Sequence, residues 1–291
     1  MKRLFRFLIM LSAITLLLVM MAVPVGAIQN GTNDDDGHPY VCVVLFYDDN
    51  FEFIWRTSGE LIAPNIVLTA GHGTLYDAES ETDVPHACVW FDSNLNPNDT
   101  QTMPYEVTLY PNYGEGTSYT GTPVTYPGYN GMYNDVGVVI LDEVPAGITP
   151  VELPTAGLAD TLDMRTSVDI VGYGVQWQKR GVPDFFGFPP GFYPPPPYTS
   201  WTWNHQRQYA TAELIQSENI LGSQFLMVSA NPSKGKGGTT FGDSGGPIIL
   251  EGGSDIVLGI NSFVYNYNCS GVTYAQRIDI PDILTWLADP S

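Results

Sequence analysis

Short runs of β-branched and aromatic residues recur along this chain, separated by clusters of glycine, proline and polar residues. Runs of about 4–8 such residues between turn signals are typical of β-strands. The pattern predicts strands over 40–47, 65–69, 87–91, 136–141, 168–171, 225–229 and 256–261. Many short strands of this kind indicate an all-β sandwich or barrel.

A helical pattern occurs only near the C-terminus, where Ile283, Leu284 and Leu287 recur at positions i, i+1 and i+4. The 291 residues are enough for one or two packed units. We find no internal repeat, and we expect a boundary between two units in the Pro- and Gly-bearing stretch near 145–160.

The first 27 residues have the layout of a secretory signal peptide. Basic Lys2, Arg3 and Arg6 precede the apolar run 8–23, and Ala27 supplies a small residue for cleavage. The alternative is an uncleaved membrane anchor, although the run is shorter than the roughly 20 residues that a span needs. We therefore expect a secreted or extracellular protein whose mature part begins at Ile28.

The composition is acidic, with 31 Asp and Glu against 11 Lys and Arg and a net charge of −20. Loss of the three basic residues of the leader would lower this charge further. Such a surface repels nucleic acids and anionic membranes. We expect neither as a partner, and no membrane association after signal cleavage.

The run Gly242-Asp243-Ser244-Gly245-Gly246-Pro247 carries the clearest chemical signal. Glycines around Ser244 allow a tight turn that exposes its hydroxyl and aims backbone N–H groups at a ligand. A nucleophilic serine needs a base and an acid that orients the base. His72, in the segment LTAGH, and Asp135, in NDVGVV, are the candidates.

These three segments, in the order His, Asp, Ser, resemble the trypsin/chymotrypsin family of serine endopeptidases. GDSGGP is identical to the family's nucleophile motif, LTAGH differs from its LTAAH by one residue, and NDVGVVIL is similar to its NDIALLKL. Residues 28–31 resemble its mature N-terminus, and 283–287 resemble its closing helix. The resemblance therefore runs from residue 28 to the end of the chain.

The resemblance implies an all-β fold of two six-stranded antiparallel Greek-key barrels with a C-terminal helix and an active site between the barrels. The expected organisation is a signal peptide over 1–27 and an N-terminal barrel over 28–150, which carries His72 and Asp135. A C-terminal barrel over 151–291 carries Ser244 and ends in the helix.

The resemblance also implies roles. Ser244 attacks the peptide carbonyl, His72 moves the proton, Asp135 orients His72, and the N–H groups of Gly242 and Ser244 form the oxyanion hole. The function expected is that of a secreted, monomeric serine endopeptidase that cuts proteins or peptides through an acyl-enzyme without a cofactor. The alternative is a catalytically inactive homologue that serves as an extracellular binding module.

Cleavage specificity follows from the family's pocket positions. The resemblance places Gly238, six residues before Ser244, at the pocket floor, where an acid would be needed to bind Lys or Arg. It implies that Ser262 and Phe263 form the edge that pairs with the substrate backbone, and that Val264 and Gly271 are opposite pocket walls. Small or medium apolar P1 residues are therefore expected. In the alternative register, shifted by one, Val264 only packs in the barrel.

In the family, a newly formed Ile amine pairs with the Asp that precedes the serine. Here that pair would be Ile28 and Asp243, and cleavage after Ala27 would make export and activation one event. The alternative is that Ile28 only begins a frayed terminus.

Three further features depart from the family. Only Cys42, Cys88 and Cys269 are present, and the resemblance implies a Cys42–Cys88 disulfide that leaves Cys269 unpaired. The stretch 181–200 is rich in proline and aromatic residues and is either an exosite or lid or a rigid surface loop. Oxygen-bearing residues in Asp92–Asp99 allow a structural calcium site or a plain polar turn. No His/Cys cluster has metal-ligand spacing.

Overall fold

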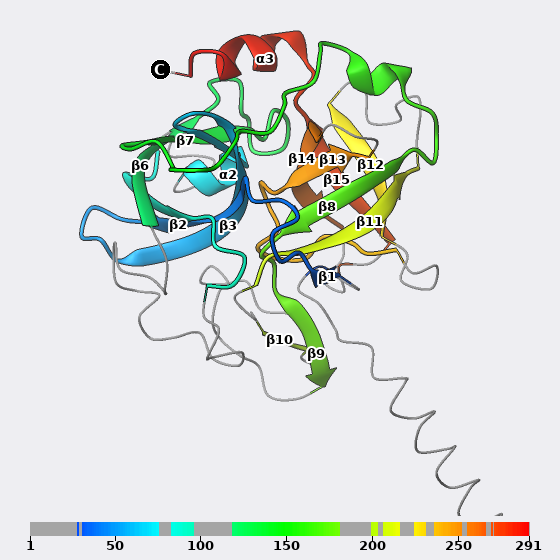
Figure 1. The fold of residues 1–291 in the computed structure, drawn as a ribbon, viewed down its shortest axis with the longest axis horizontal. Helices are drawn as coiled ribbons and strands as arrows, with labels where there is room; N and C mark the ends of the chain where they lie inside the picture. Colours follow the sequence, from blue (N-terminus) through cyan, green and yellow to red (C-terminus); the bar gives the residue numbers. More distant parts are fainter. Residues whose placement is uncertain are drawn as a thin grey trace, which may run out of the picture.

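The computed structural model describes residues 28, 31–75, 83–95, 118–180, 199–202, 206–215, 224–230, 236–251, 255–265, 269 and 271–290. They form two β-barrels that lie side by side, with the C-terminal helix across one end (Figure 1). The leader, residues 96–99 of the candidate calcium segment and residues 181–198 of the proline-rich stretch lie outside the described residues. Predictions about them stay predictions.

The first barrel is a closed antiparallel sheet in the order β2-β3-β4-β7-β6-β5. Its interior is apolar, because the runs predicted as strands contribute side chains that are almost completely buried. Its strands are β2 (Val41–Tyr47), β3 (Phe53–Ala63), β4 (Ile66–Thr69), β5 (His86–Trp90), β6 (Ser118–Thr125) and β7 (Gly137–Leu141).

The second barrel closes where β11 pairs with β8. A short N-terminal strand, β1 (Thr32–Asn33), adds to β11 from outside. The six barrel strands are β8 (Ser167–Gly172), β11 (Gln208–Leu214), β12 (Phe225–Ala230), β13 (Pro247–Leu250), β14 (Ile256–Val264) and β15 (Gly271–Arg277). Two further strands, β9 (Gln176–Arg180) and β10 (Thr199–Thr202), pair with each other.

Three short helical segments complete the described fold: α2 (Gly71–Thr74), the 3-10 helix η2 (Leu158–Thr161) and α3 (Pro281–Leu287). Helix α3 buries Ile283 and Leu287, which belong to the apolar cluster of the first barrel. Trp286 meets Tyr126 edge to face at 5.2 Å. Because α3 follows β15 in the chain, its packing joins the end of the second barrel to the first.

All seven predicted strands and the C-terminal helix are confirmed. The strands that the apolar pattern did not predict include β3 and β11, both rich in polar residues. In β11, alternate residues are buried, as expected for a sheet with one covered face. In β3, Ser58 and Glu60 are fully buried although they are polar, because this part of the strand faces other protein segments rather than water.

The expected Cys42–Cys88 disulfide is wrong. Both residues are free and buried, as is Cys269. Strands β2 and β5 are neighbours, but Cys88 lies opposite Leu45, three positions from Cys42. Three residues of strand span about 10 Å, and residues an odd number apart point to opposite faces. A disulfide requires Cα atoms within about 7 Å, so this register excludes it.

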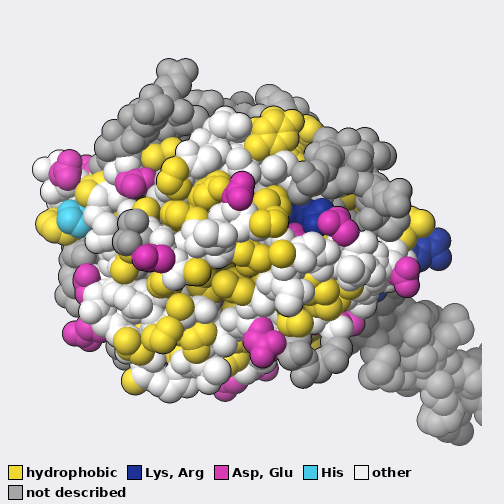
Figure 2. All heavy atoms as spheres, turned by 90° about the horizontal axis from the view of Figure 1, so that it is seen from above, with side chains coloured by type: hydrophobic (Ala, Val, Ile, Leu, Met, Phe, Trp, Pro, Cys, Tyr) yellow, Lys and Arg dark blue, Asp and Glu magenta, His cyan; other side chains and the backbone are white. Residues whose placement is uncertain are grey.

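Acidic side chains are scattered over the face that Figure 2 shows, with few Lys or Arg side chains among them. This distribution agrees with the excess of acids in the sequence. Among the described residues, no helix has the length and apolar character needed to span a membrane.

Candidate active site

His72 and Asp135 form a hydrogen-bonded pair at one edge of the first barrel. The pairing of β4 with β7 sets Thr69 opposite Gly137, so the turns that carry His72 and Asp135 meet. His72 Nδ1 lies 2.8 Å from Asp135 Oδ2, and the backbone N–H of His72 donates to Oδ1 at 2.8 Å. The His72 side chain is 39% exposed, whereas the Asp135 side chain is only 4% exposed.

The close approach depends on Gly71. A Cβ atom at this position would lie 2.8 Å from the carbonyl oxygen of Val136, closer than side chains tolerate. The backbone of α2 therefore packs directly against the residue after Asp135. This contact explains why glycine stands here, where the family motif has alanine.

The second barrel helps to hold the carboxylate of the first. Ser262 on β14 donates its hydroxyl to Asp135 Oδ2 at 2.5 Å, and Gln276 Oε1 on β15 accepts the backbone N–H of Asp135 at 3.2 Å. Sequence reasoning assigned Ser262 only to the substrate-binding edge and did not identify Gln276. No sequence signal points to Gln276, because its role depends on how the barrels face each other.

The two groups shift each other's ionisation. For His72, burial lowers the pKa, but the neighbouring Asp135 carboxylate outweighs it and raises the pKa above 6.5. For Asp135, burial raises the pKa, but His72 and the hydrogen bond from Ser262 lower it by more, which leaves the pKa below 3.8. Asp135 is therefore ionised near neutral pH and favours the imidazolium form of His72.

Ser244 lies in a tight turn of the second barrel that faces the first. Gly242 and Gly245 have φ of +94° and +78°, respectively. The N–H groups of Asp243, Gly245 and Gly246 donate to backbone carbonyls within and next to the turn. Within the described residues, the N–H groups of Gly242 and Ser244 donate to no backbone carbonyl. They are the two that the sequence assigned to the oxyanion hole.

This turn packs against the segment that leads to His72. A Cβ on Gly245 would lie 2.3 Å from Thr69 Oγ1 and 2.6 Å from the nitrogen of Ala70, two residues before His72. The N–H of Ser58 donates to the carbonyl of Ser244 at 2.8 Å, and its hydroxyl donates to the carbonyl of Gly242 at 2.9 Å. The fold therefore brings the three sequence-predicted catalytic segments together at the junction of the barrels.

Asp243 and Ile28, the expected activation pair, are not together in the intact chain. Ile28 is fully buried among apolar residues of the second barrel, including Val168 and Ile170. The Asp243 carboxylate accepts the N–H of Gly174 at 2.7 Å, the N–H of Thr240 at 2.8 Å and the Thr240 hydroxyl at 3.0 Å.

Burial raises the pKa of Asp243 to about 6, while these hydrogen bonds and the nearby Arg56 act in the opposite direction. The Asp243 side chain has no exposure to water.

Four of the five predicted substrate-binding residues lie on β14 and β15: Ser262, Phe263, Val264 and Gly271. Val264 pairs with Thr273, and Gly271 begins β15 with φ of +99° and open space where a Cβ would stand. The ring of Phe263 stacks on Tyr274 at 4.8 Å with an interplanar angle of 5°. Gly238 is buried.

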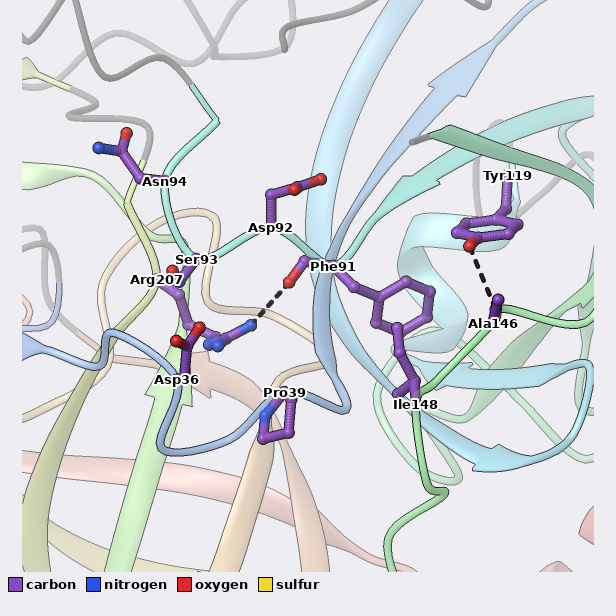
Figure 3. A pocket seen from close by; sticks show the side chains of 10 residues that line it. All are labelled: Asp36, Pro39, Phe91, Asp92, Ser93, Asn94, Tyr119, Ala146, Ile148 and Arg207. Atoms are coloured by element: carbon purple, nitrogen blue, oxygen red, sulfur yellow. Dashed lines mark hydrogen bonds between the residues drawn. The ribbon is translucent and has the colours of Figure 1, made fainter. Parts of the chain in front are cut away.

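A separate cleft of about 380 Å³ lies away from these residues (Figure 3). It is lined by Arg207, Phe91 and Tyr119 among others, and none of His72, Asp135 and Ser244 lines it. The Arg207 guanidinium is 1% exposed and donates to Asp34 Oδ2 at 2.6 Å and to several backbone carbonyls, including that of Phe91 at 2.9 Å. Arg207 therefore ties the N-terminal segment to the barrels.

No group of metal-ligating side chains occurs among the described residues.

The paired barrels and the site at their junction define the two-barrel serine protease fold. A family model described as Trypsin matches residues 28–186 and 197–287, so the chain belongs to the trypsin family.

Solved structures agree on the fold. An HL collagenase structure aligns with a TM-score of 0.61 and 18% identity, covering 90% of this chain and 97% of the collagenase chain. A human heparin binding protein aligns with a TM-score of 0.54 and 15% identity, with the same coverage of both chains. No curated protein sequence matches this chain significantly.

Proposed function

We propose that this trypsin-family protein is a secreted serine endopeptidase that uses Ser244, His72 and Asp135. The observation that carries the proposal is the His72–Asp135 pair, whose carboxylate is fixed by His72 and Ser262 beside the Ser244 turn. A buried, ionised acid that holds one ring nitrogen leaves the other free to take a proton from a nucleophile.

The reaction follows from this arrangement. Ser244 Oγ attacks the peptide carbonyl as His72 accepts its proton, and the N–H groups of Gly242 and Ser244 bind the oxyanion that forms. The imidazolium then protonates the leaving amine, which leaves an acyl-enzyme, and water activated by the same imidazole releases the acid. Asp135 stabilises the imidazolium at each stage, as the raised pKa of His72 indicates.

We also propose a preference for small or medium apolar P1 residues. Gly238 at the pocket floor brings no carboxylate to pair with a Lys or Arg side chain. Val264 narrows one wall, and Gly271 leaves the other open. The substrate backbone would pair along Ser262 and Phe263 as an added strand. The substrates are proteins or peptides, and the enzyme acts as a monomer without a cofactor.

The alternative is an inactive homologue that binds a ligand outside the cell. The likeness to a heparin binding protein keeps this alternative in view. Heparin is a polyanion, however, and a chain with a net charge of −20 repels polyanions over most of its surface.

Covalent labelling separates the two functions. A fluorophosphonate should label the exported protein at Ser244, and Ser244→Ala should lose the label and several orders of magnitude of peptidase activity while remaining folded. His72→Ala should lose about as much activity, because the residues act as a unit. If a correctly folded wild-type protein takes no label and cuts no peptide, the binding-module alternative stands.

A further inference from the structure

Strand β3 of the first barrel supports the nucleophile turn of the second through two side chains. Arg56 and Ser58 lie two positions apart and so share one face of the strand. Arg56 Nη1 donates to the carbonyl of Tyr173 at 2.8 Å. The Ser58 hydroxyl accepts the N–H of Tyr173 at 2.9 Å and donates to the carbonyl of Gly242. Both ends of the Tyr173 backbone are thereby bonded to β3.

The Arg56 guanidinium also packs directly against the turn. A Cβ on Gly242 would lie 2.5 Å from Arg56 Nη1 and 3.1 Å from its Cζ atom. Any side chain at position 242 would therefore displace the guanidinium. The positive charge therefore stands beside an expected oxyanion-hole N–H group, and its field also acts on the buried carboxylate of the next residue, Asp243.

Asp243 needs such a charge because it is completely buried. Its polar contacts from Gly174 and Thr240 are neutral hydrogen-bond donors. A buried carboxylate with no positive charge nearby is costly, and one with a counter-ion can fix the loop that carries it. Arg56 also acts to lower the pKa of Asp243 against the effect of burial.

We propose that Arg56 is a positioning residue that supplies the positive charge for Asp243 and holds the Gly242–Ser244 turn in its folded shape in the intact chain. The turn then has its two N–H groups available while Ile28 is buried elsewhere, among Val168 and Ile170. The turn therefore has this shape in the intact chain, before any cleavage after Ala27, and we expect it to keep that shape without the Ile28 amine. This inference rests on the proposed peptidase function for its kinetic consequences only.

The first test compares Arg56→Gln and Arg56→Lys in the full chain, expressed for export. Arg165→Gln is a matched control, because Arg165 is exposed and the charge change is the same. Arg56→Gln should lower kcat by about 10- to 100-fold with little change in KM, since loss of one oxyanion donor costs about 10²–10³ in kcat. Arg56→Lys should recover most of the loss, and Arg165→Gln should act like wild type. Equal kcat values for wild type and Arg56→Gln would overturn the proposal.

A second readout does not depend on catalysis. Amide hydrogen exchange at Gly174 and within 240–246 should be faster in Arg56→Gln by about tenfold or more, with the rest of the two barrels unchanged. Unchanged exchange in these segments would reject the role of Arg56 even if the protein proved inactive. If the exchange effect is present but no variant, including wild type, has activity, then the peptidase function fails and the positioning role stands.

A third variant tests independence from the N-terminus. One serine is inserted between Ala27 and Ile28, and intact mass establishes where the exported protein begins. A product that carries an extra residue before Ile28 should keep kcat/KM within about threefold of wild type. A loss of 100-fold or more, with fold and exchange rates retained, would show that the Ile28 amine supports the site and would refute the proposal. A product that starts at Ile28 calls for a two-residue insertion, read in the same way.

Discussion

The hydrogen bond from Ser262 to Asp135 gives the sharpest quantitative prediction. The Asp135 carboxylate forms three hydrogen bonds with His72 and Ser262. Two come from His72, and the third, from the Ser262 hydroxyl, is the shortest at 2.5 Å. Ser262→Ala removes the third without touching the other two. Ser262 is 8% exposed and Asp135 3% exposed, so water has little access to replace the lost donor.

The size of the effect follows from the charge and the burial. A hydrogen bond to a charged group contributes about 1.5–3 kcal/mol to stability, and about 1.4 kcal/mol corresponds to a factor of ten. Ser262→Ala should therefore lower the free energy of unfolding by about 1.5–3 kcal/mol. If a similar share is lost when the imidazolium forms, kcat should fall by about 10- to 100-fold. KM should change little, because substrate pairing along this strand uses the backbone of Ser262.

The assay is steady-state hydrolysis of an apolar-P1 peptide well below the unfolding temperature, with urea unfolding in parallel. Ser167→Ala serves as a control, because Ser167 starts β8 away from the Asp135 carboxylate. Asp135→Asn marks the full loss of the acid, with a reduction in kcat of about 10⁴ expected. A kcat of Ser262→Ala within twofold of wild type would show that the His72 bonds alone fix the carboxylate, contrary to this reasoning.

Four other outcomes are expected. The raised pKa of His72 means that kcat/KM falls as pH drops through a value above 6.5, where the imidazole becomes protonated. An apparent pKa at or below 6.5 for the acid limb of the kcat/KM profile would contradict this. Glu60 is buried, and neither of its carboxylate oxygens is hydrogen-bonded to another described residue. Burial raises its pKa well above 4.5, so wild type loses stability as pH rises through and beyond the ordinary range of a carboxylic acid. The free energy of unfolding of Glu60→Gln minus that of wild type should therefore increase between about pH 4 and pH 8 in urea titrations. A difference that stays constant would refute the burial argument. A peptide library should show P1 Ala, Val or Leu well above Lys or Arg, and a dominant basic preference would mean that the pocket floor is misassigned. The denatured protein should react with a thiol reagent at all three cysteines without prior reduction, whereas a count of one thiol would indicate a disulfide.

The sequence alone determined the elements whose side chains face an apolar interior, and it was enough to single out the groups that we propose react. Strands such as β2, β4 and β7 are continuous apolar runs because both their faces are covered, so composition was enough to predict them. Ser244 was predicted because the glycines of a tight turn must be adjacent in the chain. Its order relative to His72 and Asp135 then indicated the trypsin family and, through it, the two barrels.

The tertiary structure decided what depends on the packing of one barrel against the other. Strand β3 was not predicted because polar Arg56, Ser58 and Glu60 interrupt its apolar residues. In the folded protein, Arg56 and Ser58 form hydrogen bonds to the second barrel. The predicted Cys42–Cys88 disulfide was wrong because strand register cannot be deduced from cysteine positions in the sequence. Ser262 and Gln276 reach Asp135, and Arg56 reaches the Asp243 turn, across long separations in sequence. Hydrogen bonds and charge pairs act over a few ångströms in space, and only the assembled barrels set those distances.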